Sequence, residues 1–505
     1  MHPFARRAIL ASALLAWVSS AARAQWPSTT LPPDNWAVPF VEHLIQSGII
    51  PDPDPLTRPL SRSAVLRSLL SVDTAALPAE VGSTVGDLIR RLEAPMSGPT
   101  MALFPYVGLR SVSQGRRDPL RAGGQGSTAI QMGFEGWATT GPFAMSSAGI
   151  LDRGLRFDPD YTGSKDRPLA FRFYDAYVSV QRRYGEIAYG SVDRNWGPAG
   201  IEGLMHSSGP YGYDHLFARI GASNLRLELL LAQLNDTLSP SGTTEHRWWF
   251  GHRLVLRPWP WIVGSLEEGI LFREGPTLET WYLNPLSLSK FTREQNGLPD
   301  SAKVEWAGDL WLRLPRGMVL QLQMLINDMT LLSPHKAAPD RLGGTALIDI
   351  PLSRRASIRA LGTFVSSLTY RTFSDAAVET QIIRNVGLGR NFDDYAQWTL
   401  SGGWLARPRV LISPELTLLL QGEGNILKQT PLPDPHYPFL FVGTVERTMR
   451  VGLRIQTWSW KSFDLSVQGG LNRINNVNNV PGVSTTRPTG EVVLRYHLGG
   501  EFATP

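Results

Sequence analysis

Residues 224–236, NLRLELLLAQLND, decide the fold of this chain. From Leu225 to Leu231 every second residue is a leucine, and the positions between them begin with Arg226 and Glu228. Strict alternation of apolar and polar residues is typical of a β-strand with one apolar face. Such a face needs either the core of a soluble sandwich or the acyl chains of a membrane.

The same alternation returns in three further stretches, residues 303–314 (KVEWAGDLWLRL), 318–328 (MVLQLQMLIND) and 446–456 (ERTMRVGLRIQ). Only Pro315, Arg316 and Gly317 separate the first two stretches, which predicts a hairpin. The polar faces carry full charges of both signs, as the interior of a membrane barrel does. These charges favour a barrel over a sandwich.

The connections between the runs alternate between short and long. The short ones fall at residues 141–142, 182–185, 258–260, 315–317, 353–354, 407–409 and 458–461, and the long ones near 114–126, 152–168, 194–213, 236–245, 274–302, 329–342, 373–393, 425–443 and 474–488. Short turns on one rim and long loops on the other are typical of outer-membrane barrels. Residues 99–505 are therefore predicted to form an all-β transmembrane barrel of about 18 antiparallel strands in the outer membrane.

In this barrel the leucines of 224–236 face lipid, because a closed barrel pairs every backbone polar group within the protein. Aromatic residues at two short turns are predicted to form a girdle at the membrane surface: Trp259, Trp261, Trp458 and Trp460.

The first residues, 1–25 (MHPFARRAILASALLAWVSSAARAQ), have the pattern of a secretory signal, with cleavage expected after Ala24. Three arginines and no acid lie within residues 1–24, so 46 basic and 44 acidic residues remain. This near-balance gives no electrostatic case for a nucleic-acid partner. The chain has no cysteine, which excludes disulfides, thiolate nucleophiles and cysteine-ligated metals. After residue 24, nothing approaches the roughly 20 consecutive apolar residues of a membrane helix.

Residues 25–98 are predicted to form a small periplasmic helical module that plugs or braces the barrel. Helical spacing appears in DNWAVPFVEHLIQSGII, with Asp34 and Asn35 as cap candidates and Gly48 as the stop, and in LSRSAVLRSLLSVD and VGSTVGDLIRRLEA. Residues 34–70 also resemble an S-layer homology repeat in their Trp-Ala start, Gly-Ile-Ile break and Thr-Arg-Pro-Leu-Ser-Arg helix entry. That resemblance implies contact with the cell wall, with peptidoglycan as the partner.

Three ordered motifs carry a resemblance that covers the whole mature chain: RNWGPAGIEGLMHSSGP (194–210), WYLNPLSLSKF (281–291) and GDLWLRLPRGMVLQLQMLIND (308–328). Together with the signal, short helical part and large barrel, they resemble the Wzi capsule-assembly family. The resemblance implies an 18-stranded outer-membrane barrel with a periplasmic helical bundle. It also implies a lectin-like role in holding capsular or related surface polysaccharide at the cell surface.

Sugar binding calls for aromatic faces beside planar polar groups, and an anionic polymer adds a need for arginine or lysine. Two long loops supply such groups and are expected to lie together at the extracellular mouth. The candidate ligand-binding residues are Asp193, Arg194, Asn195, Trp196, Tyr211, Tyr213 and Asp214 in the first loop, and Trp281, Tyr282, Asn284, Lys290 and Arg293 in the second. The alternative is structural: the tryptophans belong to a girdle, Asn284 shapes a turn, and Asp193 pairs with Arg194.

Catalytic signatures such as His-Glu-x-x-His and Gly-x-Ser-x-Gly do not occur in the sequence. His246 and His252 are six residues apart, which matches no familiar metal site. We therefore expect no enzymatic activity, no metal and no cofactor. The alternative functions are a porin-type channel for sugars or small solutes and a cell-wall tether acting through the helical module. Outer-membrane lipid and lipopolysaccharide are the other expected partners.

Overall fold

The computed structural model describes residues 27–92, 100–207, 209, 211–238, 242–274, 280–297, 302–328, 339–371, 380–428, 434, 436–458 and 462–498. The predicted signal, residues 1–24, lies outside these residues. Within the described ranges, no helix is both long enough and apolar enough to cross a membrane.

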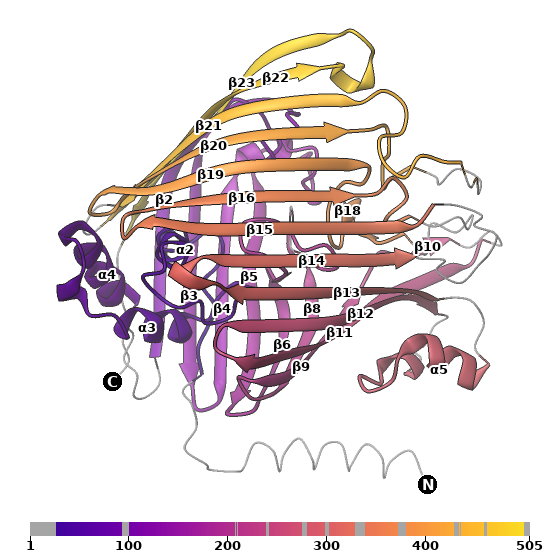
Figure 1. Cartoon of the computed structure of the whole chain (residues 1–505), viewed down its shortest axis with the longest axis horizontal. Helices are drawn as coiled ribbons and strands as arrows, with labels where there is room; N and C mark the ends of the chain where they lie inside the picture. The colour runs from indigo at the N-terminus through magenta and orange to yellow at the C-terminus, as the bar shows by residue number, and fades with distance from the viewer. Residues whose placement is uncertain are drawn as a thin grey trace.

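Eighteen antiparallel strands form one closed ring, in which each strand pairs with the next and the last pairs with the first (Figure 1). The two-residue β10 (Thr237–Leu238) adds to the side of β11. This confirms the predicted barrel of about 18 strands. The ring contains β2 (Thr100–Val112), β3 (Ser127–Thr140), β4 (Phe143–Asp152), β5 (Ala170–Arg182), β6 (Gly185–Val192), β8 (Asp214–Gly221), β9 (Leu225–Gln233), β11 (Thr244–Trp259), β12 (Ile262–Glu274), β13 (Ala302–Arg313), β14 (Val319–Asp328), β15 (Arg341–Ser353), β16 (Ala356–Val365), β19 (Tyr395–Arg407), β20 (Val410–Gln421), β21 (Glu446–Trp458), β22 (Phe463–Asn475) and β23 (Ser484–His497).

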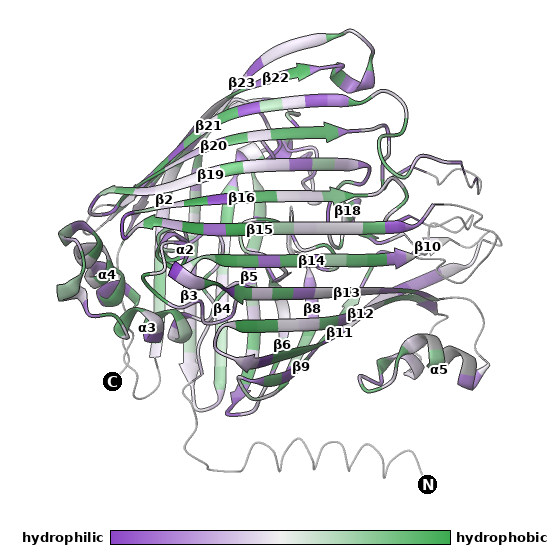
Figure 2. Cartoon of the chain, in the orientation of Figure 1, coloured by the Kyte–Doolittle hydropathy of each residue, from purple (hydrophilic) through white to green (hydrophobic). Residues whose placement is uncertain are grey.

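The alternation along the strands separates an apolar outer face from a polar inner face. In β9, Leu225 is exposed on the outside, whereas Glu228 is buried on the inside. In β21, Val451 is 64% exposed and Leu453 is also exposed, while Arg450 points inward and is buried. Figure 2 shows apolar residues recurring along the strands of the wall. Leu225, Leu227, Leu229 and Leu231 thus lie on the outer face, as their spacing predicts, whereas Leu230 and Leu234 are buried inside the barrel with Trp196.

The aromatic residues predicted to form a girdle are exposed at one short turn and buried at another. Trp259 and Trp261, beside the turn between β11 and β12, stack at 5.6 Å between ring centroids and are half exposed. Trp458 is buried instead, because Phe40 packs edge-on against it at 4.1 Å and Trp36 lies at 4.9 Å. The girdle prediction for Trp458 is therefore wrong. Trp460 lies outside the described residues.

Three helices follow the predicted stretches: α2 (Val38–Gln46), α3 (Arg62–Leu70) and α4 (Ala79–Leu92). The chain leaves α2 through Gly48, whose φ of +67° favours glycine. Their apolar faces share one core with Leu405 and Leu411, which flank the short turn between β19 and β20. The helices therefore sit at the short-turn end of the barrel (Figure 1).

Ion pairs join the helices to the turns beneath them: Glu80 pairs with Arg355, and Asp87 pairs with Arg409. His43 of α2 is buried, and one of its ring nitrogens, Nε2, lies 3.2 Å from the carbonyl oxygen of Arg355. These contacts join the helices to the short turns of the barrel.

Candidate functional site

The lumen is entered by two segments that meet inside the barrel. β1 (Thr57–Arg58) comes from the linker between α2 and α3, and β7 (Asn195–Trp196) comes from the loop between β6 and β8. They pair antiparallel, with Thr57 opposite Trp196 and Arg58 opposite Asn195. Leu56 then packs on side chains of the inner wall, including Val255 and Trp311. A part of the helical module is thereby joined to a long loop from the opposite rim.

Trp196 is the centre of this junction and is 0% exposed. The guanidinium of Arg253 lies 4.5 Å from the centroid of its ring, and the ring of Trp249 lies 6.3 Å away, centroid to centroid. Arg253 itself is held by two buried carboxylates, Glu228 at 2.7 Å and Glu267 at 3.5 Å. Its guanidinium also donates to the carbonyl oxygen of Leu56 at 3.1 Å. One arginine thus joins three barrel strands to both segments that fill the lumen.

Residues that precede Trp196 in the chain fix the conformation of the loop through hydrogen bonds and ion pairs. The side-chain oxygen of Asn195 accepts a hydrogen bond from the backbone of Gly203 at 2.6 Å, and its amide donates to the carbonyl of Ile201 at 3.1 Å. Asp193 accepts from Arg172 at 3.0 Å, rather than pairing with Arg194 as the structural alternative supposed. The guanidinium of Arg194 lies 3.6 Å above the ring of Phe217, and burial lowers its pKa.

The remaining candidates of the first loop divide between buried and exposed positions. The hydroxyl of Tyr211 donates to Asp158 at 2.5 Å. The hydroxyl of Tyr213 lies 2.8 Å from Nδ1 of His206, and burial lowers the pKa of His206 well below its usual value. Asp214 is exposed at the start of β8.

The second loop lies outside the barrel. It contains η3 (Trp281–Leu283) and α5 (Ser289–Asn296), and Figure 1 shows α5 beyond the wall formed by β11 and β12. Tyr282 is buried against Phe272, at 5.3 Å between ring centroids, whereas Trp281 is half exposed. Asn284 is exposed, and its side chain accepts from the backbone of Leu286 at 3.1 Å. Lys290 and Arg293 belong to α5, but their side chains lie outside the described structure.

The expectation that the two loops lie together at the mouth is wrong. Trp196 packs on the inner face of β11 through Trp249, while Tyr282 packs on the outer face through Phe250 and Phe272. The loops are therefore on opposite sides of one wall. Their contact with a saccharide stays a prediction.

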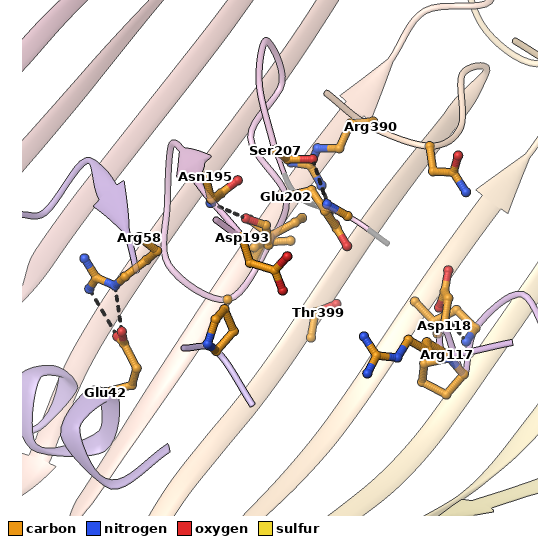
Figure 3. Close-up of a pocket in the computed structure, with 18 of the residues that line it drawn as sticks. Glu42, Arg58, Arg117, Asp118, Asp193, Asn195, Glu202, Ser207, Arg390 and Thr399 are labelled. Atoms are coloured by element: carbon orange, nitrogen blue, oxygen red, sulfur yellow. Dashed lines mark hydrogen bonds and ion pairs between the residues drawn. The ribbon is translucent and has the colours of Figure 1, made fainter. Parts of the chain in front are cut away.

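A cavity of about 700 Å³ lies in the lumen beside the first loop (Figure 3). It is lined by the helical module through Asp34 and Glu42, by long loops through Arg117, Glu202 and Arg390, and by the inner wall through Thr399, Glu415 and Arg454. Of the predicted candidates whose side chains the structure describes, only Asp193 and Asn195 line it. The long loops near 114–126 and 373–393 are evident in the sequence, but no local pattern shows that residues such as Arg117 and Arg390 face the lumen.

Carboxylates fix the orientation of two arginines that line the cavity, Arg58 and Arg359. Arg58 binds Glu42 at 2.6 Å and Asp52 at 2.8 Å, and Arg359 binds Asp349 through two contacts of 2.7 and 2.8 Å. The guanidinium of Arg121 lies 4.1 Å from the ring centroid of Phe392.

Asp34 shows how the cavity stabilises a carboxylate. Burial opposes its charge, but Arg117 at 3.3 Å, Arg172 and Arg495 together hold its pKa below the usual range. Charged, hydrogen-bonding groups therefore face the cavity in defined positions.

Metal-binding geometry does not appear in the described part of the chain, where no group of three or more His, Cys, Asp or Glu residues could hold an ion.

No protein-family model matches the chain, and no curated protein matches it in sequence. Among solved structures, the chain is similar to Wzi of Escherichia coli, described as an outer-membrane protein involved in group 1 capsule assembly and a carbohydrate-binding β-barrel. The TM-score is 0.61 at 13% sequence identity, over 94% of this chain and 100% of Wzi. At this identity the likeness shows a shared fold. OprD of Pseudomonas aeruginosa and a BenF-like porin of Pseudomonas fluorescens follow, each with a TM-score of 0.45, at 10% and 9% identity, over 80% and 79% of this chain and 97% and 98% of theirs.

Proposed function

We propose that the protein lies in the outer membrane and binds capsular or related surface polysaccharide without enzymatic activity. The observation that carries this proposal is the luminal cavity, which is framed by long loops and lined by oriented charged and hydroxyl groups. The apolar outer face suits acyl chains, and in outer-membrane barrels the long loops are extracellular. Wzi, whose fold this chain shares, is described as a carbohydrate-binding β-barrel.

The chemistry of the cavity suits a hydroxyl-rich ligand. Arginine and carboxylate groups can donate to and accept from neighbouring hydroxyls, and their mutual pairing fixes their orientation before a ligand arrives. Arg454 is exposed in the cavity, and its guanidinium donates to Gln468 at 2.8 Å. Thr399 and Ser401 add hydroxyl groups on the same wall. Several weak contacts of this kind along a polymer act together through avidity.

The test is binding of a polysaccharide panel to the refolded mature chain. Arg454→Ala should weaken the binding of a recognised polysaccharide roughly tenfold, since a hydrogen bond to a charged group is lost. Arg219→Ala is the matched control, because Arg219 pairs with Glu186 at 2.7 Å away from the cavity and should leave binding unchanged. In cells, deletion of the gene should release polysaccharide while its synthesis continues. Unchanged retention would contradict the proposal.

A channel for sugars or small solutes is the second candidate. It is favoured by the extent of the cavity, whose lining runs from Glu42 of the helical module to Glu202 and Asn391 of the long loops. Conductance in planar bilayers separates the two functions. Large, steady openings would support the channel, and a sealed lumen would support the polysaccharide binder.

A further inference from the structure

A carboxylate lies on the outer face of the barrel, where the alternation calls for apolar residues. Glu268 of β12 is opposite His252 of β11 and Trp306 of β13, and its neighbour on the same face, Leu266, is 73% exposed. Glu268 itself is only 2% exposed. The outer face is therefore covered here, and its apolar residues Phe250, Ile270 and Phe272 are buried as well.

The cover is the loop of residues 280–297. The backbone N–H of Ser289 donates to both carboxylate oxygens of Glu268, at 3.2 and 3.1 Å, and its hydroxyl donates at 3.0 Å. From the wall itself, the indole N–H of Trp306 donates at 3.0 Å, and Nε2 of His252 lies 3.4 Å away. These contacts hold the start of α5 against the outer face. Figure 1 shows α5 alongside the wall and not above its rim.

The height of Glu268 places this contact within the apolar band. It is seven residues further along the chain than Trp261, which marks the short-turn rim. With a rise of about 3.3 Å per residue and a tilt of about 40°, that distance is roughly 18 Å along the barrel axis, against an apolar band of about 25 Å. Ser289 therefore lies at the depth of the leaflet nearer the long loops.

Between residues 281 and 291 this loop exposes several large apolar side chains, beside the exposed polar Asn284. Trp281, Leu286, Leu288 and Phe291 are all exposed, with Leu286 at 87% and Phe291 at 59%. Four large apolar side chains within eleven residues are unfavourable in water but match acyl chains.

We infer that residues 280–297 are immersed in the outer leaflet and bind lipid acyl chains through Trp281, Leu286, Leu288 and Phe291. Glu268 and Ser289 hold the loop at this depth, since a carboxylate at this height needs hydrogen-bond partners that lipid does not supply. This inference rests on the membrane location proposed above and is independent of polysaccharide binding.

Because the chain has no native cysteine, a single introduced cysteine can carry a fluorescent label that tests the inference. Leu286→Cys reports on the loop, Leu266→Cys on the barrel wall, and Asn478→Cys on an exposed loop at the same rim. Each variant, shown to keep the wild-type circular dichroism, is placed in phosphatidylcholine vesicles whose acyl chains carry bromine.

Quenching at position 286 should match that at 266 within about twofold and exceed that at 478 several-fold. Quenching at 266 alone would overturn the inference and leave the membrane location standing. Quenching at neither 266 nor 286 would overturn both.

Discussion

Loops 193–213 and 280–297 carry similar side chains, including a tryptophan, a tyrosine and an asparagine each, yet they end on opposite sides of one barrel wall. The first is drawn inward by Arg253, which lies over Trp196 and binds two inner carboxylates. The second is held outside by Glu268, an acidic residue on the outer face of the same two-strand unit, β11 and β12. Charged wall residues, rather than loop composition, decide where each loop lies.

Replacing Trp196 and Trp281 should give the largest difference in stability between the two loops. Trp196→Ala leaves a cavity in the packed lumen and removes the ring beneath Arg253, so the free energy of unfolding should fall by about 3–5 kcal/mol. Trp281→Ala removes a half-exposed ring and should cost less than about 1 kcal/mol. Urea unfolding of both variants in the same detergent measures the difference. Equal losses would show that the two loops are not packed as described.

Acid should weaken the helical module, on which the inner loop depends through β1. Burial lowers the pKa of His43 to about 4, although the carbonyl of Arg355 partly opposes the shift. The folded protein therefore holds a neutral imidazole, whereas the unfolded chain binds a proton near pH 6.5. The stability is complete above about pH 6.5 and is lost as the pH falls through 4, by up to about 3 kcal/mol.

Urea unfolding at pH 7 and pH 4 tests this effect against His43→Gln. The variant cannot take up the proton, so its stability should fall less over the same interval. A decrease as large as that of the wild type would assign the acid sensitivity to other groups.

Replacing Asn195 and Asn284 should give the smallest difference in stability between the two loops. Asn195→Ala leaves the buried N–H of Gly203 without its 2.6 Å partner and should cost about 1–3 kcal/mol. Asn284→Ala removes one hydrogen bond from an exposed turn and should change stability by about 0.5 kcal/mol or less. If hydrogen exchange at Gly203 were unchanged in the Asn195 variant, the inner loop would not depend on this side chain.

Strand positions could be predicted from the sequence because each strand carries its own periodic signal. The turn at Pro315–Gly317 was predictable too, and Arg316 and Gly317 adopt positive φ there, at 62° and 78°. The three helices likewise follow from local spacing and from Gly48.

The loop positions depend on partners far apart in the chain. Trp196 is buried against Arg253 and Trp249, which follow more than 50 residues later in the chain. Trp458 looks like a girdle residue until Phe40, some 400 residues earlier, covers it. The cavity residues Arg117 and Arg390 belong to loops without periodicity, so no local pattern shows that they face the lumen. A single sequence therefore predicts the strands of the barrel wall but not the positions of the loops inside it.

The central claim is that neighbouring residues of a strand face lipid and a polar lumen in turn. Leu453 and Arg454 of β21 test it directly, since Leu453 is exposed on the outer face and Arg454 lines the cavity. A spin label on a cysteine at each position, in lipid vesicles, should be more accessible to oxygen at 453 and to a water-soluble nickel complex at 454. Equal accessibility at the two positions, or the reverse order, would contradict the account.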